Sequence, residues 1–212
     1  MESNLKVFES RIVDKNSSII FVCGHSGSGK STFAEVLAKE LGYKHINVDH
    51  FCFDICRDEE FLKVATEEIG EHIYDENGQL VKSFEIGSQV LYNRNGRAQK
   101  CAKIFFDNVE IKLRELTAEG PCVVEWFALP LLKIWQGNSL KVLVHVSDEQ
   151  VRIKRIMDRK PILESMLRER EKARVEYDID DFDVVFNNDG SKEEMIQAVV
   201  GLRGLIDSLL CQ

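Results

Sequence analysis

The sequence has no C-x-x-C pair, no long apolar run and no excess of basic residues. Its 212 residues include 6 cysteines, and several of these lie within apolar stretches. We therefore expect reduced thiols in a cytoplasmic protein rather than a disulfide framework. His50, Cys52 and Cys56 lie close together in the chain, but their spacing matches none of the common zinc patterns.

Apolar runs and charge also limit the partners that the chain can have. No run approaches the roughly eighteen apolar residues of a membrane-spanning helix, and residues 1–16 are too polar for a signal peptide. Acidic residues outnumber basic ones by 36 to 28, and the formal net charge is −8. Because a nucleic-acid-binding surface needs a basic excess, we predict neither a membrane nor a nucleic-acid partner.

The most informative stretch is rich in glycine and lies near the N-terminus. Gly24, Gly29, Lys30 and Ser31 match the pattern G-x-x-x-x-G-K-[ST], which is the phosphate-binding P-loop or Walker A motif. An apolar run over residues 19–23 precedes the motif, and apolar side chains at helical spacing follow it. This context of strand, loop and helix is the one that a P-loop requires.

The chemistry of phosphate binding explains these residue types. Glycines let backbone N–H groups turn inward toward phosphate oxygens, and the N-terminus of the following helix adds partial positive charge. Lys30 supplies a cation to the outer phosphates, and the hydroxyl of Ser31 can bind Mg²⁺. We expect the whole loop to contact ATP: Gly24, His25, Ser26, Gly27, Ser28, Gly29, Lys30, Ser31 and Thr32.

Alternating strands and helices predict an α/β fold, with a parallel, five-stranded sheet between layers of helices. The apolar runs predict strands at residues 18–23, 44–48, 121–126, 140–146 and 183–186. Helical spacing predicts helices at residues 30–41, 61–72, 84–92 and 97–117, and a last one that ends near residue 210.

Helix ends can be read from the sequence as well. Gly42 is expected to end the helix that follows the P-loop. Ser147 with Gln150, and Ser191 with Glu194, match the capping box that opens a helix. Before the first strand we expect a short helix, because Leu5, Phe8 and Ile12 fall on one helix face.

The strands divide the chain into a nucleotide-binding core and an insertion. Residues 1–49 and 120–212 are expected to form the P-loop core, within which about 151–174 form a helical lid. Residues 50–119 contain no confident strand, so we interpret them as a helical insertion that binds the acceptor of the reaction.

Two carboxylates are expected at the carboxyl edge of the sheet, where open α/β sheets bind ligands. Asp49 ends the second predicted strand and could deprotonate or position an attacking hydroxyl, or it could instead cap a helix. Glu125 ends the third and could hold Mg²⁺ through water, or cap a turn. Trp126, the next residue, and Trp135 are interpreted as core or cleft wall.

Arginines on one helix face could stabilise the charge of a transferring phosphoryl group. Arg152, Arg155 and Arg159 are spaced by three and four residues, and of these we favour Arg155 and Arg159 as functional lid residues. The alternative is a solvated charged face. An asparagine amide in the loop over residues 187–190 could bind adenine, or the loop could be a plain turn.

In this order and spacing the motifs resemble those of the dephospho-coenzyme A kinases, over roughly residues 18–205. Those enzymes combine a P-loop with a strand that ends in a catalytic aspartate, matched by Asp49, and a strand that ends in glutamate, matched by Glu125. Their lid carries R-x-x-x-R, matched by Arg155 and Arg159. The resemblance implies that Asn188 contacts adenine.

The acceptor side departs from that family. Lys82 stands where the family usually has arginine, and no proline occurs before residue 121, so the histidine–proline pair of the family is missing. The basic residues expected to bind the acceptor are Lys82, Arg94 and Arg97.

Together the motifs predict an ATP- and Mg²⁺-dependent kinase for a hydroxyl of a small molecule, foremost the ribose 3′-hydroxyl of dephospho-CoA. A uridine or other nucleoside kinase is the alternative, because Asp49 to Phe51 are similar to the aspartate–x–phenylalanine segment of uridine kinases. An alternative of another class is a nucleotide-binding switch without catalysis, although the sequence has no N/T-K-x-D guanine motif.

Overall fold

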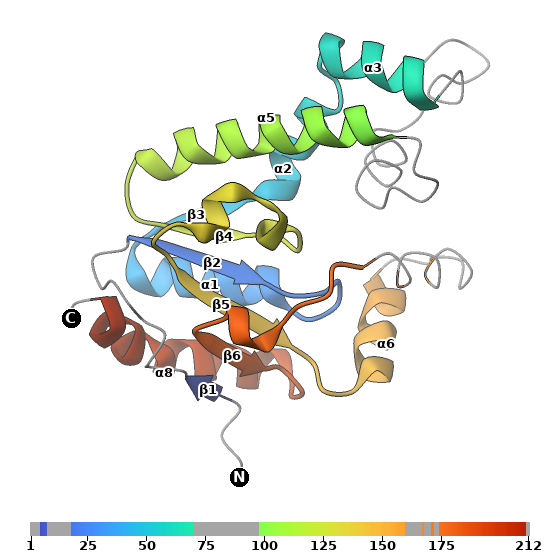
Figure 1. The fold of residues 1–212 in the computed structure, drawn as a ribbon. Coiled ribbons are helices and arrows are strands. Elements are labelled where there is room, and N and C mark those ends of the chain that lie inside the picture. The colour runs from blue at the N-terminus through green and yellow to red at the C-terminus, as the bar shows by residue number, and fades with distance from the viewer. Residues whose placement is uncertain are drawn as a thin grey trace.

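The computed structural model describes residues 5–7, 18–69, 98–159, 167, 171 and 174–210. These residues form a sheet that is covered by helices on both faces (Figure 1). The helix predicted at residues 84–92, and Lys82, Arg94 and Arg97, lie outside the described residues. The division into a core and an acceptor-binding insertion stays a prediction.

The sheet has six strands, of which five are parallel, as the sequence predicts. Their order across the sheet is β1-β6-β5-β2-β4-β3, and β1 pairs with β6 in the antiparallel direction. The expected leading helix is wrong at residues 5–7, because these residues add the edge strand. The bounds are β1 (Leu5–Val7), β2 (Ile19–Cys23), β3 (Lys44–Asn47), β4 (Cys122–Glu125), β5 (Leu140–His145) and β6 (Val184–Asn187).

The described helices follow the predicted order with differences of a few residues at their ends, except that α2, which comes directly after β3, was not predicted. The α-helices are α1 (Lys30–Leu41), α2 (Val48–Ile55), α3 (Glu59–Ile69), α5 (Gln99–Ala118), α6 (Glu149–Arg159) and α8 (Lys192–Leu210). Three short 3₁₀ helices, which we did not predict, connect the later strands: η3 (Leu129–Leu131), η4 (Lys133–Gln136) and η5 (Ile179–Asp181). No described helix is both long and apolar enough to cross a bilayer.

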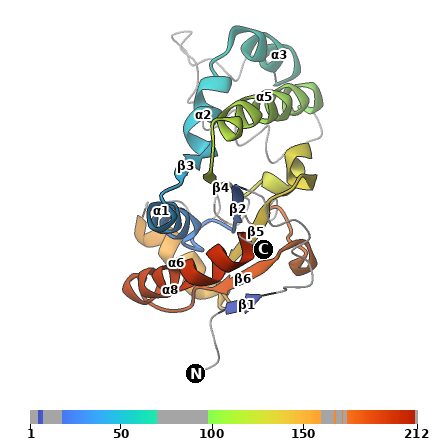
Figure 2. The ribbon, with the colours of Figure 1, turned by 90° about the vertical axis from the view of Figure 1, so that its left-hand side faces the viewer.

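Two apolar clusters hold the layers together, one on each face of the sheet. Helices α1 and α8 lie against one face, while α2 and α5 lie over the other (Figure 2). The α1 and α8 side buries Phe33, Leu37, Val142, Phe186 and Val199. The α5 side buries Phe21, Phe105, Val109, Leu113, Val124 and Trp126. Because both faces are covered, the central strand β2 is apolar throughout rather than alternating.

Helix ends decide where several candidate residues lie. Gly42 ends α1 in the left-handed conformation, as predicted. Strand β3 ends at Asn47 and not at Asp49, because the side chain of Asn47 accepts the backbone N–H of Asp49 and caps α2. Asp49 therefore lies in the first turn of a helix.

The two predicted capping boxes differ in outcome. At α8 the box is confirmed, since Ser191 accepts the N–H of Glu194 and Glu194 accepts the N–H of Ser191. At α6 it is wrong, because Asp148 accepts the N–H of Gln150. Ser147 instead donates its hydroxyl to Asp189.

Candidate active site

The P-loop connects β2 to α1 and packs tightly against two other segments. Gly27 has φ of +82°, and a Cβ atom there would lie 2.6 Å from the carbonyl oxygen of Arg152 in α6. Gly29 has φ of +90°, and a Cβ there would lie 2.4 Å from Nδ2 of Asn188. Glycine is therefore required both by the backbone conformation and by the close contact.

Asn188 supports the P-loop from the loop that follows β6. Its side-chain nitrogen donates to the carbonyl oxygen of Ser28 at 2.7 Å, and the residue is buried. Its backbone N–H donates to the carbonyl of His145 at 2.7 Å. The structure thus gives Asn188 a role in holding the P-loop, and the contact with adenine stays a prediction.

Glu125 is buried at the end of β4 and is surrounded by hydrogen-bond donors. The side chain of Asn47 donates to its Oε1 at 2.7 Å, and Nε2 of His45 lies 3.4 Å from the same oxygen. The hydroxyl of Ser31 lies beside the carboxylate and favours its ionised form. Burial raises the pKa of Glu125, but His45, Ser31 and the charge of Lys30 outweigh it, so the net pKa is lowered.

These donors fit a magnesium ion. Mg²⁺ prefers oxygen ligands, and the Ser31 hydroxyl and the ionised Glu125 carboxylate lie in contact beside the phosphate-binding loop. Among the residues that the structure describes, no group of three or more His, Cys, Asp or Glu side chains could hold a metal, here or elsewhere. The role of Ser31 and Glu125 as metal residues stays a prediction.

Asp49 lies beside this pair, and two contacts fix it in place. The indole N–H of Trp126 donates to Oδ1 at 2.9 Å, and Asn47 holds its backbone N–H. The side chain of Asn47 thus connects Asp49 to Glu125. The protein packed around its carboxylate raises the pKa of Asp49, although the charge of Lys30 and the bond from Trp126 oppose this.

The arginines of α6 have three different surroundings. Arg155 donates to the carbonyl oxygens of Asn188 and Gly190, at 2.9 and 2.8 Å, so it joins α6 to the loop after β6. Arg159 is exposed near the end of the helix. The arginine that contacts the P-loop is Arg152, which is only 3% exposed and donates to the carbonyl of Ser26 at 2.9 Å.

Arg152 is the centre of an ion-pair network. Both of its terminal nitrogens contact the carboxylate of Glu171, and Nη2 lies 3.2 Å from Glu149. Arg174 contacts the same two glutamates, at 2.8 Å from Glu149 and 3.3 Å from Glu171. The network joins α6 and the P-loop to Glu171 and Arg174.

His25 connects the P-loop to the residues that follow Arg174. Its ring stacks on Tyr177 with centroids 4.6 Å apart, and Nε2 lies 2.9 Å from the carbonyl oxygen of Val175. Burial lowers the pKa of His25. Because a neutral ring can donate to this carbonyl, the contact does not need a charge.

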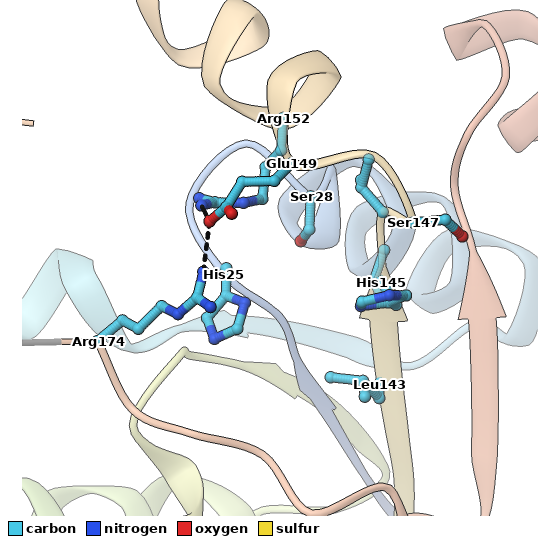
Figure 3. Close-up of a pocket in the computed structure, with 10 residues that line it drawn as sticks. His25, Ser28, Leu143, His145, Ser147, Glu149, Arg152 and Arg174 are labelled. Atoms are coloured by element: carbon cyan, nitrogen blue, oxygen red, sulfur yellow. Dashed lines mark hydrogen bonds and ion pairs between the residues drawn. The ribbon is translucent and has the colours of Figure 1, made fainter. Parts of the chain in front are cut away.

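A cavity of about 210 Å³ lies beside the P-loop, and its wall includes His25, Ser28, Arg152 and Arg174. Figure 3 shows these side chains around the end of β5, with Glu149 between the two arginines. Since both arginines are paired with glutamates, their charge is largely neutralised. The phosphates of a nucleotide would therefore meet the loop amides and Lys30 first.

Three residues that matter here were missed as functional residues. Arg152 was placed on the arginine face, but nothing in its spacing distinguishes it from Arg155. Asn47 precedes Asp49 by two residues, which is a recognisable capping pattern. Trp126 follows Glu125 directly, and only the tertiary fold brings its N–H to Asp49.

The fold and the P-loop together define the class of the P-loop α/β proteins. The sequence model of a family described as an AAA domain matches residues 20–176. That span exceeds half of the chain, so the chain belongs to this family.

Several proteins that are similar to this chain in structure or sequence are named as kinases. The fold is similar to TT1252 from Thermus thermophilus, with TM-score 0.66 and 22% identity over 88% of this chain and 96% of that chain. It is also similar to dephospho-CoA kinase from Campylobacter jejuni, with TM-score 0.59 and 18% identity over 90% and 98%. These likenesses show that the chain has the fold of the P-loop kinases.

The curated relatives match over shorter stretches. A shikimate kinase from Chlorobium phaeobacteroides (strain BS1) is 31% identical over 86 residues, which is 40% of this chain and 42% of that protein. The chain thus matches less than half of the length of the curated relatives.

The tight packing of the P-loop on α6 gives a testable difference between two glycines. Gly27 and Gly42 both have positive φ, but only at Gly27 would a Cβ atom meet other atoms. We expect Gly42→Ala to lower the free energy of unfolding by about 1 kcal/mol. Gly27→Ala should lower it by about 1–3 kcal/mol more, because of overpacking. Urea denaturation measures both, and equal losses would contradict the packing.

The network around Arg152 predicts unequal effects for its two glutamates. Glu171→Gln removes the carboxylate that pairs with both terminal nitrogens of a buried arginine, and we expect a loss of about 2 kcal/mol. Glu149→Gln is the control, because Glu149 is exposed and should contribute less than about 1 kcal/mol. Thermal and urea unfolding measure both. A larger effect of Glu149→Gln would show that Glu171 is not the principal partner.

Proposed function

We propose that this protein is an ATP- and Mg²⁺-dependent kinase that phosphorylates a hydroxyl group of a small metabolite. One observation carries the proposal. Asn47 hydrogen-bonds both the Glu125 carboxylate and the backbone N–H of Asp49, and the Ser31 hydroxyl of the P-loop lies beside the same glutamate. The charge of Lys30 acts on both carboxylates. The groups that we propose to bind phosphate, to hold Mg²⁺ and to accept a proton therefore lie close together.

Each residue has a part in phosphoryl transfer. Lys30 and the backbone N–H groups of residues 24–32 would bind the phosphates and stabilise their charge. Ser31 and Glu125 would hold Mg²⁺, which neutralises phosphate charge when it is bound. Asp49 would accept the proton of the acceptor hydroxyl while the oxygen of that hydroxyl bonds to the γ-phosphorus. The bridging oxygen between the β- and γ-phosphorus then leaves with the electron pair as ADP.

The lid arginines take separate parts in this proposal. Arg155 holds the carbonyls of the loop after β6, so it would set the position of Asn188 and the adenine site. Arg159 is exposed and so is open to a phosphate or an acceptor. Arg152 supports the P-loop through Ser26.

Two acceptors are supported by different observations. Dephospho-CoA is favoured by the motif order described above and by the similarity of fold to the Campylobacter jejuni enzyme. Shikimate is favoured by the local identity to shikimate kinases, 31% over 86 residues in one relative and 51% over 37 in another. Both are small molecules, and Lys82, Arg94 and Arg97 are proposed to bind the acceptor.

The test of the function is consumption of ATP in the presence of a panel of acceptors. The panel holds dephospho-CoA, shikimate and uridine, each with Mg²⁺, and the product is identified by mass spectrometry. Turnover of dephospho-CoA supports the leading choice, and turnover of shikimate or uridine alone selects that kinase instead. Tight binding of ATP without turnover of any acceptor would favour a nucleotide-binding switch.

The acid–base role of Asp49 predicts a large loss of activity upon Asp49→Asn. We expect kcat to fall about a hundred-fold or more, with unchanged binding of ATP. The base must be ionised, and the pKa of Asp49 is raised. As the pH is lowered, kcat of the unaltered protein should therefore begin to fall at a higher pH than it would for an aspartate with the ordinary pKa. Asp54→Asn, an exposed position on the same helix, is the control. Near-normal turnover of the Asp49 variant would exclude the general base.

A further inference from the structure

Trp126 has a buried ring and a polar contact at the edge of the candidate active site. Its side chain is 0% exposed, and its indole N–H donates to Oδ1 of Asp49 at 2.9 Å. A buried indole needs a partner for its N–H group, and here that partner is a carboxylate. Such a bond to a charged acceptor is stronger than one between neutral groups.

Aromatic packing holds the indole ring of Trp126 in place. Phe105, Phe106 and Phe127 surround the indole, with ring centroids 6.4, 6.0 and 5.5 Å away. Two of these lie on α5, and the third follows Trp126 in the chain. A ring held on several sides by aromatic packing presents its N–H in one fixed direction.

Asp49 is therefore held through both its backbone and its side chain. Asn47 accepts its backbone N–H at 2.9 Å, and Trp126 donates to one carboxylate oxygen. The other oxygen, Oδ2, has no hydrogen-bond partner among the described residues. One oxygen is thus used for positioning, and the second is left for the proton of an acceptor hydroxyl.

We infer that Trp126 is a positioning residue that fixes the Asp49 carboxylate, a role that rests on the proposed kinase function. In the step itself, the acceptor O–H proton passes to Oδ2 while the acceptor oxygen bonds to the γ-phosphorus. The bond from that phosphorus to the bridging oxygen breaks, and ADP leaves with its electron pair. Trp126 neither gains nor loses an atom in this step.

The charged groups around Asp49 set the direction of its titration. Lys30 from α1 and His50 from α2 favour the carboxylate, and Glu125 from β4 opposes it. The residue as a whole is exposed, but the protein packed around its carboxylate is the largest influence and raises the pKa of Asp49, while the bond from Trp126 lowers it. Removal of the indole N–H should therefore raise the pKa of Asp49 further.

The contact can be tested without any activity. The chain has 2 tryptophans, so ¹⁵N-labelled indole gives two N–H signals, and the one absent from Trp126→Phe belongs to Trp126. We expect this signal to shift with pH in the unaltered protein and to stop doing so in Asp49→Asn. Trp135→Phe makes the same assignment if Trp126→Phe does not fold. A signal that titrates equally in Asp49→Asn, or does not titrate at all, overturns the inference.

Kinetics then test the positioning role with the acceptor that the protein turns over. Trp126→Phe keeps an aromatic ring but removes the N–H, and we expect kcat to fall about ten-fold with KM for ATP unchanged. The acidic limb of the pH profile should move to higher pH. Trp135→Phe alters the other buried tryptophan and should leave kcat and the pH profile unchanged.

The two failures can be distinguished. If no acceptor is phosphorylated, the proposed function fails, and the indole signal still decides whether Trp126 and Asp49 are coupled. If an acceptor is phosphorylated but Trp126→Phe leaves kcat and the pH profile unchanged, the kinase function stands and the positioning role is wrong.

Discussion

The parallel pairing of β2 with β4 and β5 is the constraint on which the candidate site depends. Val22 in β2 lies opposite Glu125 in β4, and Asn47 in β3 lies opposite the same glutamate. Since all these strands end at one edge, the P-loop and the carboxylates meet there without any long-range adjustment. The burial of both faces beneath helices keeps this edge in register.

The site also depends on two tight contacts of the P-loop itself. Helix α6 packs on Gly27, and Asn188 packs on Gly29, so the loop is held from two sides. Arg152 adds a hydrogen bond to Ser26 and is neutralised by glutamates that come from different segments. Residues 174–177 are thus connected to the P-loop through the network of Arg152 and through His25.

Much of the fold could be predicted because its signals are local. A continuous apolar run is typical of a buried parallel strand, and glycine after a helix is a common stop. The errors arose where local signals compete. Residues 5–7 have apolar spacing that suits a helix, but they pair with β6. At α6, Asp148 and Ser147 are both good caps, and Asp189 takes the hydroxyl of Ser147.

The sequence by itself determined the P-loop, the five parallel strands and the candidate carboxylates, because each depends on residues that are close together in the chain. Only the tertiary structure decided which side chains support them. Trp126 reaches Asp49 across 77 positions of sequence, and Arg152 reaches Ser26 across 126. Such contacts leave no periodicity or spacing in the sequence, because the sheet and the packing of α6 bring the partners together only after folding.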